Sequence, residues 1–231
     1  MRIKPDSLML FAAGLGTRMG ALCTSRPKPL IEVAGKPLID HALDLADDAG
    51  IDTMVANIHY LPEQLAAHLA PRGVALSLEA HELLDTGGGL KQALPLLGGD
   101  AAFTLNSDAV WTGPNPLKEL AALWQPDRMD ALLLLVPHAQ AFAHQGPGDF
   151  RLGKDGALQR GDGFVYTGAQ IIKTGPVAGM PGAVFSLNPV WDRIGADGRL
   201  YGAVHHGGWC DVGHPGGIVA AEQMLAGQDD V

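Results

Sequence analysis

The sequence has few cysteines, few aromatic residues and no long apolar run. Its two cysteines, Cys23 and Cys210, lie far apart, which excludes a disulfide framework and is typical of a reducing compartment. No apolar stretch approaches the roughly 20 residues that a membrane span requires. The N-terminal apolar run passes directly into a glycine loop, so we interpret it as a strand rather than a signal peptide. We expect a soluble, cytoplasmic protein.

Positive charge is also scarce. There are 16 Lys and Arg against 25 Asp and Glu, which gives a formal net charge of −9. Nucleic-acid binding needs a basic face, so we expect no nucleic-acid partner and no membrane partner, whereas a few local cations suffice for a small anionic ligand. The 231 residues are 47% hydrophobic, enough for one core, so we expect a single domain over 1–231. The sequence carries no signal of an oligomeric state.

Strands and helices alternate in the first part of the chain. Apolar patterning predicts strands at 7–13, 52–58, 74–79, 101–106 and 130–136, and helices at 37–49, 62–70, 86–97 and 116–124. This alternation is typical of a parallel sheet with helices on both faces. We therefore expect an α/β, Rossmann-like fold with a mostly parallel sheet, whose ligands bind at the carboxyl ends of the strands.

The pattern changes after residue 136. The segments 149–152, 164–172 and 200–212 resemble strands joined by long glycine-rich connections. We interpret this second part as an elaboration of the same domain rather than as a separate one.

The first predicted strand ends in Gly14-Leu15-Gly16, and Arg18 and Lys28 follow. Glycine allows backbone N–H groups to point into an anion-binding concavity. Arginine grips a phosphate through two parallel hydrogen bonds, and lysine acts as a point charge. The prolines on both sides of Lys28 restrict its backbone. The pattern favours a triphosphate site, and the alternative is a solvated loop with two surface cations.

Two common nucleotide motifs do not fit this loop. Met19 stands where the dinucleotide fingerprint has its third glycine, and the second strand ends in Asn57-Ile58 rather than in an acid. The P-loop is excluded because no Gly-Lys-Ser/Thr follows the glycines.

Longer motifs carry a resemblance to a family. AAGLGTRMG at 12–20 and PKPLIEVAGKPLI at 27–39 resemble the signature of the sugar-phosphate nucleotidyltransferases. Further matches are LLDTGGG at 83–89, LNSDAVW at 105–111, GDFRL at 148–152, YTG at 166–168 and WCDVGHP at 209–215. The resemblance implies a GT-A-like fold that transfers a nucleotidyl group from a nucleoside triphosphate to a sugar 1-phosphate and releases pyrophosphate.

Within that family, the combination of TGGG, GDFRL and W-x-D-V-G is most similar to the uridylyltransferases that use UTP and N-acetylmuramic acid 1-phosphate in peptidoglycan recycling. A mannose-1-phosphate guanylyltransferase is the alternative enzyme, and a non-catalytic nucleotide-sugar sensor is the alternative of another class. The resemblance implies that about 1–136 forms the nucleotide-binding core, and that about 137–231 forms the sugar-binding part and closing elements.

The resemblance also implies roles for individual residues. The catalytic residues would be Arg18, Lys28 and Asp108, and a Mg²⁺ cofactor would be held by Asp108 and Asp211. The nucleotide would contact Ala12, Ala13, Gly14, Leu15, Gly16, Thr17, Glu82, Thr86, Gly87, Gly88 and Asn106. The sugar would contact Asp149, Phe150, Arg151, Thr167 and Gly168.

The sequence departs from the family at two places. Ser107 stands where the family has glycine before the aspartate, and we expect activity to survive this change. The Glu-Lys-Pro segment that many relatives carry before the Tyr-Thr-Gly strand is missing. His205 and His206 adjoin each other and would face opposite ways in a strand, so we interpret them as surface or core histidines rather than a metal pair.

Overall fold

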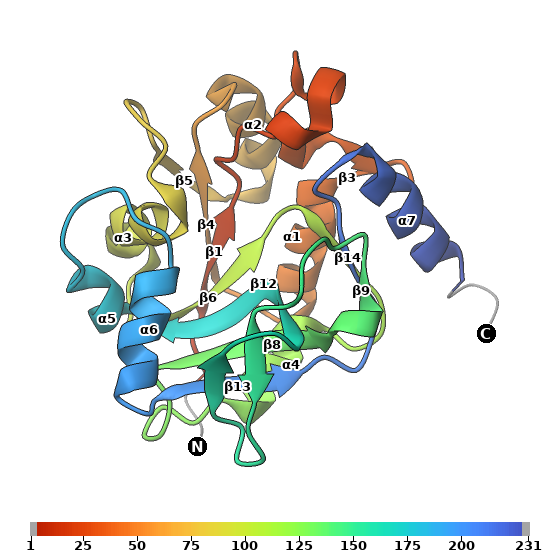
Figure 1. The fold of residues 1–231 in the computed structure, drawn as a ribbon. Helices are drawn as coiled ribbons and strands as arrows, with labels where there is room; N and C mark the ends of the chain where they lie inside the picture. The colour runs from red at the N-terminus through yellow and green to blue at the C-terminus, as the bar shows by residue number, and fades with distance from the viewer. Residues whose placement is uncertain (1–3, 228–231) are drawn as a thin grey trace.

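The computed structural model of the chain describes residues 4–227 (Figure 1). Its main sheet begins with a parallel half formed by the first part of the chain. The strands are β1 (Ser7–Phe11), β4 (Thr53–Ile58), β5 (Ala75–Leu78) and β6 (Ala101–Asn106), in the order β6-β1-β4-β5. Because the pairs are parallel, the carboxyl ends of all four strands meet at one edge of the sheet.

The second half of the sheet is largely antiparallel. The long strand β12 (Phe164–Lys173) pairs antiparallel with β6 and with β8 (Ala131–Pro137), and β13 (Leu200–Val204) pairs parallel with β8. A short hairpin, β10 (Phe150–Leu152) and β11 (Leu158–Arg160), extends from the start of β12. The expected α/β fold is confirmed, and the sheet is mixed because the second half enters as a long antiparallel strand rather than through crossover helices.

Helices cover both faces of the sheet. Alternate residues of β1 point to opposite faces: Leu8 and Leu10 join a core with helices α1, α2 and α4, and Met9 joins a second core with α3, α5 and α6. The bounds are α1 Leu38–Asp48, α2 Pro62–Leu69, α3 Asp85–Leu97, α4 Pro116–Leu123, α5 Thr174–Ala178 and α6 Asn188–Ala196.

A smaller layer lies beside the main sheet. The strands β7 (Ala109–Trp111), β14 (Trp209–Asp211) and β9 (Ala141–Phe142) form a three-stranded sheet in the order β7-β14-β9. Helix α7 (Pro215–Ala226) packs on it in a third core that contains Met19, Cys210 and Ala221. The remaining elements are η1 (Thr17–Cys23), η2 (Lys28–Leu30), β2 (Glu32–Val33), β3 (Lys36–Pro37), η3 (Ala70–Arg72) and η4 (His138–Gln140).

Several features of the second half differ from the sequence expectation, among them the unexpected elements β9, β11 and α5. The single strand expected over 200–212 is two strands in different sheets, β13 and β14, separated by His205–Gly208. Helices α6 and α7 were not predicted. Each has a proline in the first turn, which suits a helix start, but α7 also has two glycines there, which lower its helix propensity.

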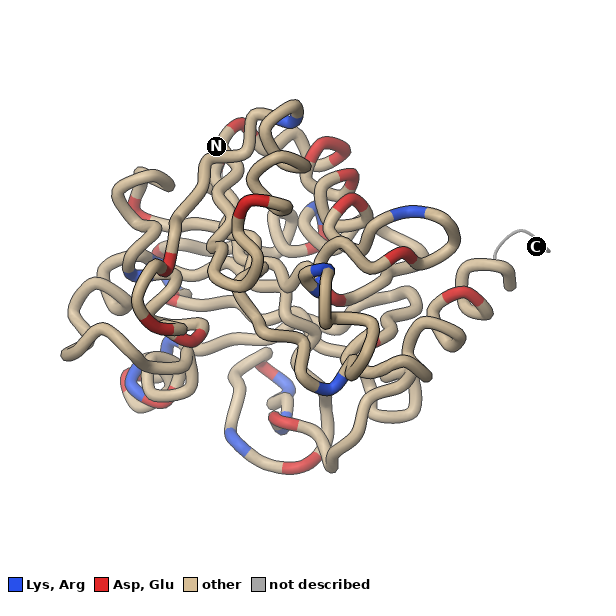
Figure 2. The backbone as a smooth tube through the Cα atoms, turned by 90° about the horizontal axis from the view of Figure 1, so that it is seen from above, with Lys and Arg blue, Asp and Glu red and all other residues tan. Residues whose placement is uncertain are grey.

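The charged residues lie mainly around the periphery of the fold. Figure 2 shows Lys and Arg as separate blue segments with red Asp and Glu segments between them. The absence of a nucleic-acid partner stays a prediction. Among residues 4–227, no helix is long and apolar enough to cross a membrane. The expected cytoplasmic location stays a prediction.

Candidate active site

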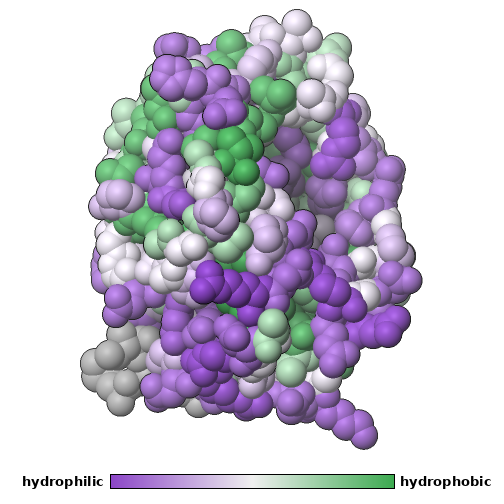
Figure 3. Space-filling view, turned by 60° about the vertical axis from the view of Figure 1, so that its left-hand side comes forward, coloured by the Kyte–Doolittle hydropathy of each residue, from purple (hydrophilic) through white to green (hydrophobic). Residues whose placement is uncertain are grey.

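A cavity opens at the carboxyl ends of the parallel strands, where ligands bind in such sheets. The upper half of the face in Figure 3 is hollowed, the half in which these strand ends lie. The cavity is lined by Phe11, Ala13, Gly14, Asn57, Leu83, Asp85, Thr86, Asn106 and Asp108. Five residues of the predicted site therefore share one cavity: Ala13, Gly14, Thr86, Asn106 and Asp108.

Lys28 lies beneath the glycine loop at the rim of this cavity. Gly16 has φ +64°, and a Cβ there would lie 2.6 Å from the Sγ of Cys23 and 3.0 Å from the Cβ of Lys28. Glycine is therefore required both for the left-handed backbone and for the close approach of η1 and η2. Lys28 is only 7% exposed, and its Nζ donates to Oδ2 of Asp108 at 2.6 Å.

Asp108 and Asp211 lie together at one end of the short β7–β14 ladder. Asp211 pairs with Ala109, and the N–H of Val212 donates to the carbonyl of Asp108 at 2.9 Å. Burial raises the pKa of Asp211, and the negative charge of Asp108 raises it further. The positive charges of Lys28, Arg18 and His144 act in the opposite direction. Two neighbouring carboxylates of this kind favour a bound cation.

Arg18 completes the cationic side of the site. It is exposed on η1, and its guanidinium lies beside Gly213, two residues after Asp211. A Cβ at Gly213 would lie 3.0 Å from both terminal nitrogens of Arg18 and from Oδ1 of Asp211. The structure thus brings Arg18, Lys28, Asp108 and Asp211 together from four separate segments.

A buried polar network holds the strand ends that frame the cavity. The side chain of Asn57 accepts from the N–H of Ala12 at 2.8 Å and donates to Oε1 of Glu79 at 2.7 Å. Oε2 of Glu79 accepts from the N–H of Leu84 at 2.8 Å. The sequence analysis missed this network, although Asn57 and Glu79 both end predicted strands. The N–H of Ala12 is engaged here, and contact of Ala12 with a nucleotide stays a prediction.

The acidic residue that faces the cavity is Asp85 rather than Glu82. Glu82 is exposed and is not part of the cavity lining. Asp85 lines the cavity with φ +61°, a strained conformation for a non-glycine residue, and its Oδ1 accepts from the N–H of Thr86 at 2.6 Å. The hydroxyl of Thr86 in turn accepts from the N–H of Leu187 at 3.0 Å.

Packing explains the glycines at 87–89. A Cβ at Gly87 would lie 2.4 Å from the ring of Phe185, and one at Gly88 would lie 2.0 Å from the carbonyl of Ala183. A Cβ at Gly89 would lie 2.7 Å from Oε1 of Glu79. These glycines let α3 approach its neighbours closely, and contact of Gly87 and Gly88 with a nucleotide stays a prediction. Contact of Leu15, Gly16 and Thr17 with a nucleotide also stays a prediction.

The residues expected to bind the sugar have different surroundings. Phe150 and Thr167 are fully buried, and the Thr167 hydroxyl donates to the carbonyl of Leu134, so neither side chain is available to a sugar. Asp149 is half-buried and its Oδ2 accepts from the N–H of Tyr166.

Gly168 and Arg151 remain candidates for sugar binding. Gly168 (φ +85°) lies under the side chain of Asn106 at the bulge of β12, because a Cβ there would lie 2.5 Å from its amide carbon. Gly168 is therefore next to a residue of the cavity wall. Arg151 is exposed beside Gly161. A sugar contact of either residue stays a prediction.

Ser107 fits the position where the family has glycine. Its φ is not positive, and its hydroxyl donates to the carbonyl of Phe11 at 2.6 Å. The serine thus joins the ends of β1 and β6 without backbone strain.

His144 acts electrostatically on Asp211 and was not singled out by the sequence analysis. It is half-buried after β9, its ring centroid lies 6.2 Å from that of Trp209, and its electrostatic effect lowers the pKa of Asp211, the smallest of the effects that act on this carboxyl. No pattern marks a single histidine in a glycine-rich loop, so only the three-dimensional structure shows its place.

Known proteins share these sequence features. The family model described as "MobA-like NTP transferase domain" matches residues 8–146, the segment that carries the glycine loop, Lys28 and Asp108. The chain is a MobA-like NTP transferase. This confirms the resemblance to nucleotidyltransferases.

Two relatives of this MobA-like NTP transferase match it over nearly its whole length. An N-acetylmuramate α-1-phosphate uridylyltransferase from Caulobacter vibrioides is 41% identical, and the alignment covers 96% of this chain and 98% of the relative. A protein of the same name from Neisseria meningitidis is 34% identical over 89% of this chain and 92% of its own.

Solved structures share the fold of this MobA-like NTP transferase. HddC from Yersinia pseudotuberculosis, complexed with GMP-PN, has a TM-score of 0.77 at 19% identity and covers 95% of this chain and 99% of its own. A UDP-glucose pyrophosphorylase complexed with UDP-glucose has a TM-score of 0.76 at 16% identity and covers 97% of this chain and all of its own. At these identities the likeness concerns the fold.

Proposed function

We propose that the protein transfers a uridylyl group from UTP to N-acetylmuramic acid 1-phosphate, which yields UDP-N-acetylmuramic acid and pyrophosphate in peptidoglycan recycling. The full-length similarity to two uridylyltransferases of this specificity supports the substrate pair. The observation that carries the reaction type is the meeting of Arg18, Lys28, Asp108 and Asp211 at the rim of the parallel strands.

The reaction is an attack by a phosphate oxygen of the sugar 1-phosphate on the α-phosphorus of UTP, and pyrophosphate leaves. The attacking phosphate is already anionic at neutral pH, so the site needs no general base. It needs in-line positioning and neutralisation of the charge on two phosphates that repel each other. Exposed Arg18 would hold the β- and γ-phosphates, and Lys28 would contact the α-phosphate and the incoming phosphate.

Nucleotidyltransferases of this family generally use a divalent metal ion, and we propose Mg²⁺ held by Asp108 and Asp211. The pair fits a hard cation because burial and mutual repulsion disfavour two bare carboxylates. Among residues 4–227, no three His, Cys, Asp or Glu side chains are grouped to hold a metal, so phosphate oxygens and water would complete the shell. The ion would neutralise phosphate charge and orient the triphosphate.

A matrix of nucleoside triphosphates against sugar 1-phosphates, with pyrophosphate release as the readout, tests the proposal. UTP with N-acetylmuramic acid 1-phosphate should give the highest kcat/KM. Higher values with GTP and mannose 1-phosphate would favour the guanylyltransferase alternative. This chain is 37% identical to one mannose-1-phosphate guanyltransferase over 48% of its length. Binding of UDP-sugar without turnover of any pair would instead identify a nucleotide-sugar sensor.

A further inference from the structure

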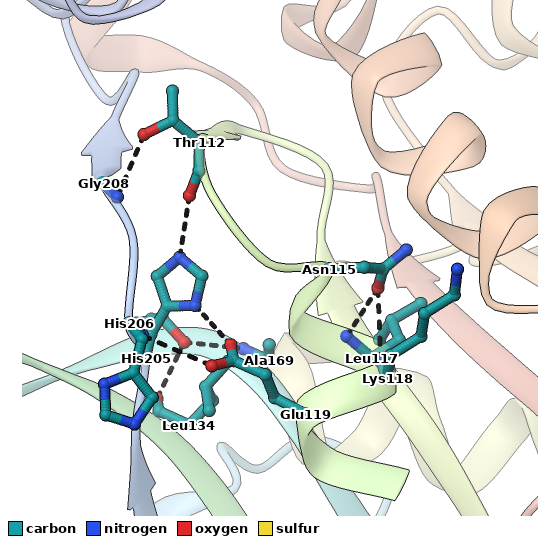
Figure 4. Close-up of polar contacts among 11 residues, drawn as sticks. Thr112, Asn115, Leu117, Lys118, Glu119, Leu134, Ala169, His205, His206 and Gly208 are labelled. Carbon is teal, nitrogen blue, oxygen red and sulfur yellow. Dashed lines mark hydrogen bonds and ion pairs between the residues drawn. The ribbon is translucent and has the colours of Figure 1, made fainter. Parts of the chain in front are cut away.

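A buried histidine that the proposed mechanism does not use lies at the far end of the β7–β14 ladder (Figure 4). His205 follows β13 and is 1% exposed. Its Nδ1 donates to Oε2 of Glu119 on α4 at 2.5 Å, and its Nε2 lies 3.2 Å from the carbonyl oxygen of Thr112, directly after β7. Both ring nitrogens therefore face an oxygen acceptor, which holds the ring in one orientation between α4 and the end of β7.

Other contacts tie the same three segments together. Oε1 of Glu119 accepts from the N–H of His206 at 3.3 Å. The N–H of Gly208 donates to the hydroxyl of Thr112 at 3.0 Å, and the N–H of Thr112 donates to the carbonyl of Gly208 at 2.9 Å. The ring of His205 stands edge-on to Trp111 with centroids 5.1 Å apart. The cluster thus fastens the His205–Gly208 connection to β7 and α4.

Glycines make this close approach possible. A Cβ at Gly207 would lie 1.9 Å from the carbonyl oxygen of Thr112, and one at Gly208 would lie 2.5 Å from its hydroxyl. Gly113 has φ +85°, and a Cβ there would lie 2.9 Å from the Cα of Gly207. Any side chain at these three positions would separate the connection from β7.

Helix α4 provides a fixed anchor for Glu119. Asn115 caps the helix, because its Oδ1 accepts from the N–H groups of Leu117 and Lys118 at 2.9 and 3.3 Å. The amide nitrogen of Asn115 donates to the carbonyl of Leu45 on α1 at 2.8 Å. The position of Glu119 is therefore set by the main body of the protein.

The ladder between the two ends is only three residue pairs long. Trp209 pairs with Trp111 next to the histidine, and Asp211 pairs with Ala109 next to Asp108. Any shift of β14 relative to β7 at the histidine end therefore changes the spacing of the two carboxylates at the other end.

We propose that the His205–Glu119 pair is a positioning device that sets the relative place of Asp108 and Asp211 for a divalent metal ion. The inference rests on the proposed function, because it takes the two aspartates as the metal ligands. Neither His205 nor Glu119 is among the residues that line the cavity at the strand ends, so we treat both as positioning residues rather than catalytic ones.

The test measures Mn²⁺ affinity by proton relaxation enhancement, with UTP present and no sugar phosphate, so that binding is separated from turnover. Glu119→Gln and His205→Gln should each weaken Mn²⁺ binding about 10-fold, the lower range for residues that orient metal ligands. In parallel assays, more Mg²⁺ should be needed for half-maximal rate, and the rate at saturating Mg²⁺ should return close to that of the wild type.

His206→Gln is the matched control. The side chain of His206 is exposed, and His206 contacts Glu119 through its backbone N–H. The His206→Gln variant should therefore bind Mn²⁺ with the affinity of the wild type. If His205→Gln does not fold, Glu119→Gln decides, since it keeps the size of the side chain and a carbonyl acceptor.

If the folded Glu119→Gln and His205→Gln variants, here called the latch variants, bind Mn²⁺ like the wild type, the positioning role is overturned. Asp108→Asn and Asp211→Asn separate this failure from that of the proposed function. If they lose Mn²⁺ binding and the latch variants keep it, only the positioning role is wrong. If the aspartate variants also bind normally, the metal site itself is wrong and both proposals fall.

Discussion

The two ends of the β7–β14 ladder contrast in how their charges are balanced. At one end, His205 is enclosed by Glu119 and Thr112, and both of its ring nitrogens have partners. At the other end, Asp108 is paired with Lys28, and burial together with the charge of Asp108 raises the pKa of Asp211. At the first end every charged or polar ring atom has a partner within the protein. At the second end the two carboxylates repel each other, which favours a cationic ligand and lowers the stability of the ligand-free fold.

The largest effect is expected from removing the carboxylates of the ligand end. Asp108→Asn and Asp211→Asn keep the shape of each side chain but remove a metal ligand, so turnover should fall about 10³-fold, at the upper range for loss of one preorganised charge contact. Turnover of both variants across a Mg²⁺ titration checks this. Near-normal rates in both would remove the basis of the two-carboxylate site.

The next largest loss of turnover is expected from removing the two cationic side chains near these carboxylates. Arg18→Ala and Lys28→Ala should each lower turnover at least ~10²-fold, because each removes a charge that neutralises a phosphate. Stability should separate them: Arg18 is exposed, whereas Lys28 is buried against Asp108. Thermal unfolding should therefore change little in Arg18→Ala and drop in Lys28→Ala. A fully active folded fraction of either variant would make that residue purely structural.

The residues of this end show how far the sequence could predict the site. The glycine loop, Lys28 and Asp108 lie in or next to contiguous motifs, and the alternating pattern placed them at strand ends. The Lys28–Asp108 pair joins residues 80 positions apart, and no local pattern contains such a pairing. The sequence indicated that both cations face the ligand, yet only packing against Gly16 and Cys23 shows that Lys28 is buried.

The second half of the chain was less predictable for a physical reason. The parallel strands are buried on both faces and appear as continuous apolar runs, so β1, β4 and β6 were expected within a few residues. The segment 200–212 also has strand character, but the glycines at 207 and 208 let the chain leave one sheet and enter another. His205 is a core histidine and His206 a surface one, as expected, and the positioning role proposed for His205 depends on this change of sheet.

Asp108 and Asp211 should have opposite effects on the stability of the metal-free protein. The raised pKa of Asp211 means that its neutral form favours the folded state below the unfolded-state pKa near ~4. This contribution is lost as the pH rises through the raised pKa, so at pH 7 the ionised group destabilises the fold. Asp211→Asn should thus raise the Tm of the metal-free protein at pH 7.

Asp108→Asn should instead lower the free energy of unfolding by about 1–3 kcal/mol, because it leaves the buried Lys28 without its charged partner. Differential scanning calorimetry with EDTA measures both variants. Equal shifts of the same sign would show that the two carboxylates are not held in the different environments described above.

The smallest effect is expected at His144, which acts electrostatically on Asp211 but is not part of the cavity lining. If its charge contributes to binding the anionic sugar 1-phosphate, His144→Gln should raise the KM for that substrate several-fold, with the KM for UTP unchanged. Steady-state kinetics with each substrate varied in turn gives the answer. An equal rise in both KM values would assign His144 to the support of Asp211.

The most direct test of the account is the place of the metal ion. In a crystal grown with Mn²⁺ and UDP-N-acetylmuramic acid, the anomalous difference map should show a peak about 2 Å from a carboxylate oxygen of both Asp108 and Asp211, with phosphate oxygens on its other side. A peak bound elsewhere, with either carboxylate unliganded, would contradict the claim that the β7–β14 ladder carries the metal site.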